Sequence, residues 1–336
     1  MKAIVQDRYG SLDELRLADV ERPTPREDEV LVRVRAASVH ADVWHVVVGL
    51  PHVLRVMGAG LARPRNRTPG TDLAGVVEAC GAAVTRFRPG DEVFGETIRG
   101  MPWVNGGAFA EYATAPESAL ALKPPGVGFV EAAAVPTTGV IALFNLRTLG
   151  RARAGTHVLI NGAGGGVGTL AVQIAKADGL RVTAVDRRDK LDMLRALGAD
   201  RVIDHEEEDF TRGDQRYDLV LDIPGNHDLA ACLRVLEVSG RYVLVGHDGY
   251  GRGMNRAFGQ IPRALGHMAR ALLDDRLPRA IFEVPDQAGA MNVLRDLLAT
   301  GRLTPHVGRT FPLAEVPEAL RCLCAGGTQG KIVVTM

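Results

Sequence analysis

The sequence predicts an α/β protein in which a β-rich domain is combined with a doubly wound parallel sheet covered by helices. Three features lead to this prediction. The first third of the chain contains short strands separated by proline and glycine turns. After Lys123-Pro-Pro-Gly126, segments with strand and helix patterns alternate. Within that second part, a glycine-rich turn at 161–168 follows a strand and precedes a helix.

The composition is that of an ordinary globular protein. Its 336 residues are enough for two domains, 46% of them are hydrophobic and 24% are charged, and the formal net charge is zero. This balance gives no sign of a nucleic-acid partner or of binding to a membrane surface. No apolar run is long enough to span a membrane and the N-terminus lacks a signal-peptide pattern, so we expect a cytoplasmic protein.

The cysteines are few and scattered. Cys80, Cys232, Cys322 and Cys324 form no Cys-x-x-Cys motif. We therefore expect neither a structural zinc site nor a disulfide framework. The simpler interpretation is that they are small packing residues or surface thiols.

The β-rich part is expected to contain strands at 29–38, 72–78, 92–95 and 106–112. In the first of these, the valines at 30, 32 and 34 alternate with the arginines at 33 and 35, which is typical of a half-buried strand. The turn Arg88-Pro-Gly-Asp91 precedes the third strand. Together they predict a compact, barrel-like domain.

The second part alternates strands with helices. Strands are expected at 156–160, 181–185, 202–204, 217–223, 241–246 and 280–284, and helices at 169–177, 190–197 and 229–236. This order predicts a doubly wound parallel sheet of six strands.

Two further segments follow the fifth strand. Residues 247–278 are glycine-rich and then amphipathic, with Ala264, Leu265, Met268 and Leu272 at helical spacing. They suggest a lid or a covering helix, and we favour the helix. The tail, 311–336, predicts a helix at 316–324 and a strand at 331–335 that returns to the first domain.

The glycine turn has the spacing Ala163-x-Gly165-x-x-Gly168, which is typical of a Rossmann nucleotide site. Gly165 would let the backbone approach a pyrophosphate, and Gly168 would let the helix pack on the sheet. We expect Gly165, Gly166 and Val167 to contact the pyrophosphate at the helix N-terminus. The alternative is a structural glycine turn without a ligand.

The residues after the second strand bear on the choice between NAD and NADP. Asp186 lies where the motif places an acid that binds the free ribose hydroxyl of NAD. Arg187 and Arg188 favour the phosphate of NADP instead. We expect NADP(H) to be favoured slightly over NAD(H).

Several blocks resemble the medium-chain dehydrogenase/reductase superfamily, in particular its zinc-independent quinone oxidoreductase-like branch. They are Pro69-Gly-Thr-Asp-Leu-Ala-Gly75, Pro89-Gly-Asp-Glu-Val-Phe-Gly95, Gly107-Ala-Phe-Ala-Glu-Tyr112, Ala132-Ala-Ala-Val-Pro-Thr-Thr-Gly139, the glycine turn and Gly330-Lys-Ile-Val-Val334. The resemblance implies a GroES-like catalytic domain at 1–125, completed by 301–336. It also implies a Rossmann NAD(P)-binding domain at 126–300, with the active site in the cleft. Thr138 would then lie near the nicotinamide, and Val245 and Gly246 near its carboxamide.

The same resemblance argues against a metal. Zinc-dependent relatives have their three ligands at positions that hold His40, Thr71 and Ala134 here. A catalytic zinc requires three protein ligands, so we expect none. Without a metal, reduction of an electron-poor acceptor is easier than oxidation of an alcohol, because the conjugated oxygen takes the charge.

We therefore expect an NAD(P)H-dependent reductase of quinones or α,β-unsaturated carbonyls, acting on a small apolar electrophile. The alternatives are an enoyl-thioester reductase, an alcohol dehydrogenase-like pathway enzyme, and a non-catalytic NADPH-binding redox sensor. A homodimer is left open.

The catalytic candidates follow the first long strand. His40 and Asp42 could donate to or accept from the substrate oxygen, although His40 could equally be a satisfied structural histidine. His45 could be a proton relay, or a surface or ribose-contacting histidine. Trp44, His52 and Thr71 are expected to line the substrate pocket, Trp44 as a wall. The segment 51–64 would cap that pocket or form an ordinary surface loop.

Overall fold

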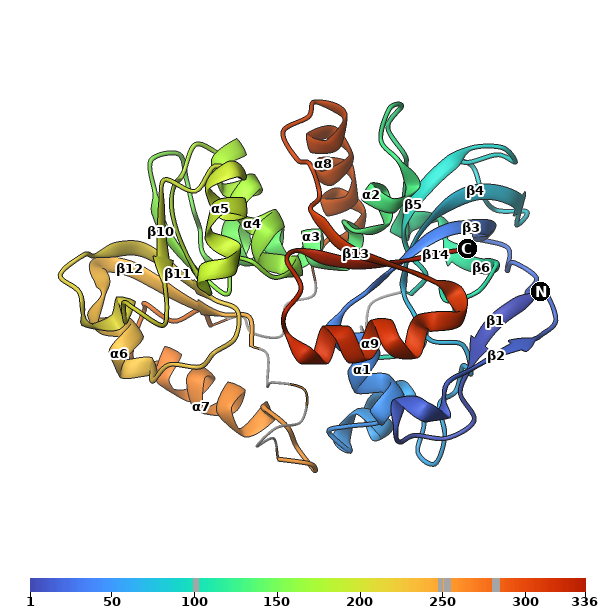
Figure 1. Ribbon diagram of the computed structural model, residues 1–336, viewed down its shortest axis with the longest axis horizontal. Coiled ribbons are helices and arrows are strands. Elements are labelled where there is room, and N and C mark those ends of the chain that lie inside the picture. Colours follow the sequence, from blue (N-terminus) through green and yellow to red (C-terminus); the bar gives the residue numbers. More distant parts are fainter. Residues whose placement is uncertain (99–102, 247–249, 251–254, 280–284) are drawn as a thin grey trace. The chain divides into compact units, whose positions relative to one another are not determined.

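The structure is a computed structural model that describes residues 1–98, 103–246, 250, 255–279 and 285–336 (Figure 1). The chain forms two compact units: the first contains residues 1–140, 255–258 and 286–336, and the second contains residues 141–254 and 259–285. Residues 126–140 and 286–300 therefore belong to the first unit, whereas the predicted boundaries placed them in the second domain. The helix α8 (Gln287–Ala299) explains part of this difference, since it packs against β7 (Leu120–Leu122) of the first unit.

The first unit is built on a sheet of seven strands in the order β13-β14-β3-β4-β5-β7, with β6 paired to β3. These strands are β3 (Glu29–Val39), β4 (Asp72–Cys80), β5 (Glu92–Glu96), β6 (Tyr112–Pro116), β13 (Val307–Pro312) and β14 (Lys331–Thr335), in addition to β7. A separate antiparallel pair consists of β1 (Lys2–Val5) and β2 (Arg16–Asp19). The return of the tail to the first unit is confirmed, because β14 pairs with β3 (Figure 1).

The alternation predicted for β3 holds only in its first half. Arg33 and Arg35 are exposed between buried valines, as expected. Residues 36–39 are buried on both faces of the strand. Residues 36–38 lie between β14 and β4 in the sheet, and the helix α2 (Phe129–Ala133) packs against β3.

The strand predicted at 106–112 is wrong. A strand begins only at Tyr112, and Ala110 makes a single bridge to Ala3. The preceding residues fold against another loop instead, since the amides of Gly106 and Ala108 both donate to the carbonyl of Gly70.

The helices of the first unit are α1 (Ala41–Val48), α2 (Phe129–Ala133), α3 (Pro136–Leu143), which extends to the second unit, α8, and α9 (Val316–Ala325). A further helical turn covers Arg55–Ala59. The predicted tail helix at 316–324 is confirmed as α9. In the described part of the chain, no helix has both the length and the apolar character needed to cross a membrane.

The second unit contains a parallel sheet of five described strands in the order β10-β9-β8-β11-β12. They are β8 (His157–Asn161), β9 (Arg181–Asp186), β10 (Arg201–Asp204), β11 (Tyr217–Asp222) and β12 (Leu236–Leu244). The helices are α4 (Gly166–Ala177), α5 (Leu191–Ala196), α6 (Leu229–Arg234) and α7 (Ile261–Ala271). The predicted α/β class with a doubly wound parallel sheet is confirmed, and the predicted sixth strand at 280–284 lies outside the described residues.

Two details of the second unit differ from the sequence prediction. β12 begins at Leu236, which the prediction assigned to the preceding helix. In α7, Leu265 is 51% exposed and the neighbouring Leu272 is 73% exposed, whereas Ala271 is buried. The predicted apolar face of this helix is therefore wrong for Leu265 and Leu272. Ala264 and Met268 are half-buried, as predicted, and lie two turns and one turn before Ala271 on the same side of the helix.

Candidate functional site

The glycine turn of the second unit joins the end of β8 to the start of α4. Gly162 adopts a φ of +79°, a conformation that other residues rarely tolerate. A Cβ atom on Gly168 would lie 2.4 Å from the Gly162 carbonyl oxygen. Only a glycine at 168 therefore allows α4 to approach the turn this closely. The amide of the buried Ala163 donates to the carbonyl of Val185 in β9, over 3.1 Å.

Gly165 differs from Gly168 because it has free space beside it. The nearest atom to a Cβ on Gly165 would be the Gly162 oxygen, at 3.7 Å. Gly165 is the N-cap of α4, provides no capping side chain, and no acidic residue follows in the first turn. The first amides of the helix, including those of Gly166 and Val167, have no partner within the helix. The turn therefore fits an anionic phosphate group.

Asp186, predicted to bind a ribose, makes contacts that the sequence did not reveal. One carboxylate oxygen accepts from the Gly164 amide at 2.7 Å, and the other accepts from the Arg187 amide at 2.9 Å. The ammonium of Lys190, a buried side chain, lies 3.5 Å from this carboxylate. Asp186 therefore holds the glycine turn in place, and Lys190 compensates its charge.

The two arginines after Asp186 are paired with neighbouring carboxylates. Arg187 donates to Asp189 at 3.0 Å. Arg188 binds Asp204 at 3.1 Å and also contacts Glu207. A ligand phosphate would therefore compete with these carboxylates for either guanidinium.

A second polar group occupies the carboxyl ends of β8 and β11, where the strand order reverses. The buried carboxylate of Asp222 accepts hydrogen bonds from Asn161 at 2.9 Å, from the amide of Gly225 at 3.0 Å and from Tyr242 at 2.8 Å. Burial and the nearby Asp222 raise the pKa of the Tyr242 hydroxyl. Val245, one of the predicted carboxamide contacts, donates its amide to the Asp222 carbonyl, and Gly246 follows it with a φ of +84°.

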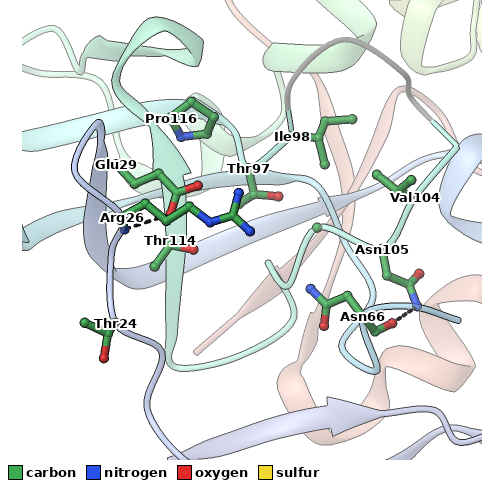
Figure 2. A pocket seen from close by; sticks show the side chains of 11 residues that line it. Thr24, Arg26, Glu29, Asn66, Thr97, Ile98, Val104, Asn105, Thr114 and Pro116 are labelled. Carbon is green, nitrogen blue, oxygen red and sulfur yellow. Dashed lines mark hydrogen bonds between the residues drawn. The ribbon is translucent and has the colours of Figure 1, made fainter. Parts of the chain in front are cut away.

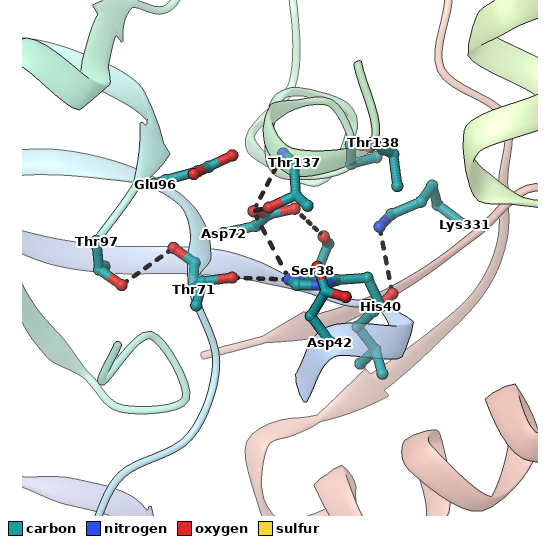
Figure 3. A network of polar contacts seen from close by, with 12 residues as sticks. Ser38, His40, Asp42, Thr71, Asp72, Glu96, Thr97, Thr137, Thr138 and Lys331 are labelled. Atoms are coloured by element: carbon teal, nitrogen blue, oxygen red, sulfur yellow. Dashed lines mark hydrogen bonds and ion pairs between the residues drawn. The ribbon is translucent and has the colours of Figure 1, made fainter. Parts of the chain in front are cut away.

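The first unit contains a buried polar cluster around His40 (Figure 3). His40 is the N-cap of α1, and its Nε2 lies 2.7 Å from the Thr71 hydroxyl. Its Nδ1 lies 3.7 Å from a carboxylate oxygen of Asp42 and has no hydrogen-bond partner among the described residues. Burial lowers the pKa of His40 to about 4, so the imidazole is neutral at neutral pH.

Two carboxylates of the cluster have different environments. Asp72 is fully buried and accepts from the Ser38 hydroxyl at 2.7 Å and from the Thr137 hydroxyl at 2.5 Å. Asp42 has no such donors in the described residues, and burial together with Asp72 raises its pKa to about 7. Asp42 therefore exchanges a proton near neutral pH.

Two members of the cluster were missed by the sequence analysis. Glu96, at the end of β5, accepts from Gln287 of α8 at 2.5 Å, and burial together with Asp72 raises its pKa to about 8. Lys331, the first residue of β14, donates to the Val39 carbonyl at 3.2 Å. Burial lowers the pKa of Lys331 to about 8. Lys331 lies in the Gly330–Val334 block that resembles the family, but this resemblance does not indicate what its side chain does.

The aromatic candidates of α1 are buried. His45 Nδ1 lies 2.8 Å from the Leu50 carbonyl oxygen, and the imidazole packs edge-on against both Trp44 and Trp103. The alternative of a surface histidine at position 45 is therefore wrong. Trp44 is buried beside it.

The remaining candidates lie apart from this cluster or at its edge. His52 is exposed, and its amide donates to the Arg256 carbonyl. Beyond it, Val56 is 73% exposed within the segment 51–64. Thr138 is buried, and its hydroxyl donates to the carbonyl of Ala134 at 3.1 Å.

A cavity of about 400 Å³ opens elsewhere in the first unit, lined by Arg26, Asn66, Thr97, Asn105 and Thr114 among others (Figure 2). The predicted pocket residues do not line it. Its connection to the cluster is Thr97, whose hydroxyl donates to the Thr71 carbonyl at 3.2 Å.

The described residues contain no group of three histidine, cysteine or acidic side chains placed to hold a metal ion. At the positions compared above with zinc ligands, Thr71 is bonded to His40, and Ala134 is fully buried.

Comparison with known proteins agrees with this architecture. Residues 26–125 match the family described as alcohol dehydrogenase GroES-like domain, and residues 197–334 match the family described as zinc-binding dehydrogenase. The 2-methylene-furan-3-one reductase of Solanum lycopersicum is 34% identical over 345 residues, covering 99% of this chain and 79% of that protein.

Two further matches extend over the whole chain. The chloroplastic NADPH-dependent alkenal/one oxidoreductase of Arabidopsis thaliana is 30% identical over 347 residues, covering 99% of this chain and 79% of that protein. The solved structure of the quinone oxidoreductase from Coxiella burnetii is 26% identical, covers 100% of this chain and 99% of that one, and superposes with a TM-score of 0.82. The chain therefore belongs to the medium-chain dehydrogenase/reductase superfamily.

Proposed function

We propose that the protein is an NAD(P)H-dependent oxidoreductase that reduces quinones or α,β-unsaturated carbonyls. The observation that carries the proposal is the glycine turn, whose open position at Gly165 faces the uncapped start of α4. The acceptor class is supported by the names of the relatives, which include a quinone oxidoreductase and an alkenal/one oxidoreductase. A steady loss of NADPH absorbance with a simple quinone or enone tests it.

In this proposal the glycine turn and Asp186 bind the dinucleotide, with Val245 and Gly246 at the carboxamide and Thr138 near the nicotinamide. When bound, the reduced nicotinamide supplies the hydride. We propose that NADP(H) is favoured slightly over NAD(H). The NADPH dependence of the Arabidopsis relative supports NADPH, whereas Asp186 favours NAD.

The side chains of the polar cluster act on the acceptor. His40 is neutral and its Nδ1 is free among the described residues, so it can donate one hydrogen bond to the acceptor oxygen in the appropriate tautomer. Asp42 holds a proton that the reduced acceptor needs. Trp44, Thr71 and His52 would complete the substrate pocket, and His45 would relay protons.

The alternatives make different predictions in the same assay. An enoyl-thioester reductase consumes NADPH with an enoyl thioester but not with a simple quinone. An alcohol dehydrogenase-like enzyme reduces NADP or NAD when an alcohol is added. A redox sensor binds the nucleotide without turnover. The cytoplasmic location and a homodimer stay predictions.

The protein is expected to act without zinc, because Thr71 and Ala134 offer no ligands for it. Purified protein should contain no stoichiometric zinc by elemental analysis and should keep its activity in a strong chelator. About one zinc per chain, removed together with the activity, would contradict this proposal.

Replacement of both arginines, Arg187→Ala with Arg188→Ala, should weaken binding of NADPH and leave binding of NADH unchanged. The loss of a charge-assisted contact to the phosphate costs about 1.5–3 kcal/mol, or roughly tenfold to 150-fold in affinity. Fluorescence titration with both nucleotides measures the difference. Equal NADPH affinity in the variant would show that the arginines serve only their carboxylate partners, Asp189 and Asp204, and would favour NAD.

A further inference from the structure

Lys331 is a buried cation in the polar cluster of the first unit, and the function proposed above gives it no role. It is only 2% exposed. Its backbone is fixed by the pairing of Ile332 with Val39 and by the bond from its own amide to the His306 carbonyl at 2.8 Å. Gly330 before it permits this path, because a Cβ there would lie 2.1 Å from the His306 oxygen. The strand therefore delivers the ammonium to a defined place.

The ammonium is anchored at the base of α1. It donates to the carbonyl of Val39, the residue directly before His40 (Figure 3). In the described part of the chain, Val39 is its hydrogen-bond acceptor, and no carboxylate lies within the 4.0 Å of a direct ion pair. Lys331 therefore acts on the acids of the cluster through its field and not through a contact ion pair.

Lys331 lies near two acids of the cluster, the fully buried Asp72 and Asp42, whose side chain is 17% exposed. Asp42 is faced by His40 at the N-cap of α1, Asp72 on β4, Glu96 on β5 and Lys331 on β14. Asp72 opposes the ionisation of Asp42, and Lys331 favours it. Burial of several carboxylates in one place is unfavourable unless a cation or protons compensate them.

We propose that Lys331 is a positioning residue of the reductase site, which acts as the counter-charge for the carboxylates of Asp42 and Asp72 from its anchor on the Val39 carbonyl. This inference rests on the proposed function in one respect, which is that Asp42 gives its proton to the acceptor. The charge arrangement itself is a property of the free protein.

The counter-charge matters in the proton step. As hydride bonds to the acceptor carbon, the electron pair of the conjugated double bond moves to the acceptor oxygen. That oxygen forms a bond to the Asp42 proton, the O–H bond of Asp42 breaks, and a carboxylate remains until solvent returns a proton. Lys331 stabilises this carboxylate, so the proton is lost more easily than it would be beside Asp72 alone.

Infrared titration of the protein without nucleotide or acceptor tests the proposal. The carboxylic-acid band that is lost in Asp42→Asn reports the protonated form of Asp42. The pH at which half of this band is lost is the titration midpoint of Asp42. This midpoint should rise by about one pH unit or more in Lys331→Met, fall in Asp72→Asn, and remain close to the native value in Lys331→Arg. An unchanged midpoint in folded Lys331→Met would overturn the proposal.

A second pair of variants covers the case in which Lys331→Met does not fold. Lys331→Met combined with Asp72→Asn removes one charge of each sign, and it is compared with Asp72→Asn alone. The double variant should have the higher midpoint, and equal midpoints would again overturn the proposal. Because the titration needs neither nucleotide nor acceptor, the absence of reductase activity would contradict the proposed function without affecting this result.

Discussion

Replacement of Gly165 by valine should abolish binding of both NADPH and NADH while the protein stays folded. A Cβ at this position meets only the Gly162 oxygen, at 3.7 Å, so the free protein can accommodate a side chain there. The same side chain would occupy the space that the pyrophosphate needs at the start of α4. Titration with each nucleotide measures binding, and circular dichroism measures folding.

The neighbouring glycines define the control. Gly168→Val would place its side chain against the backbone of Gly162 and Ala163, so loss of binding there would report damage to the turn. Gly213→Val lies in the same unit, has an ordinary φ, and its Cβ would have no neighbour closer than 4.0 Å, so this variant should bind normally. If folded Gly165→Val retained native affinity for either nucleotide, the nucleotide site would be misplaced.

Replacement of Asp42 by asparagine should lower turnover by about 100-fold or more, because positioned proton transfer contributes at least this much to many enzymes. In the native protein the donor is the protonated carboxyl. Burial and Asp72 raise its pKa to about 7, so turnover should be constant in acid and should decline as the pH rises through 7. In Asp42→Asn the remaining turnover should no longer decline as the pH rises through 7.

A nucleotide titration of the Asp42→Asn variant distinguishes a loss of proton transfer from a loss of nucleotide binding. The glycine turn belongs to the second unit and Asp42 to the first, so the affinity for NADPH should stay close to the native value. Turnover close to native in Asp42→Asn, with the decline above pH 7 retained, would remove Asp42 from the mechanism and leave His40 as the candidate donor.

The sequence predicted those parts of the molecule that are determined by patterns within short, consecutive segments. β8, the glycine turn, α4 and β9 follow one another within 157–186, and each has its own hydrophobic period or turn residue. His40 and Thr71 were singled out by comparison with the ligand positions of zinc-dependent relatives, and the structure places their side chains in contact.

The missed features join residues that are distant in the sequence. Glu96 meets Gln287 across 191 positions, and Lys331 reaches Val39 across 292. Asp222, which binds both Asn161 and Tyr242, was placed inside the strand predicted at 217–223, with no indication of these contacts. No spacing rule connects such pairs, because only the completed fold brings them together.

The predicted burial of two leucines of the α7 segment was wrong for a different reason. Leu265 and Leu272 are large and apolar, so a pattern based on hydrophobicity alone placed them inward. The buried position belongs to Ala271, which is small enough to lie in the core beside Leu277. The space available between the helix and the core determined which side of the helix is buried. The sequence does not directly show how large this space is.

The insertion of β14 between β13 and β3 has a consequence for the nascent chain on the ribosome. The described strands of the second unit lie within 157–244, so they can form a sheet before β14 leaves the exit tunnel. The stretch of β3 from Ala36 to Val39 has no β14 partner until that moment. A chain arrested before Gly330 would carry the glycine turn but would lack the ammonium that binds the Val39 carbonyl, so the polar cluster is complete only after β14 has been synthesised.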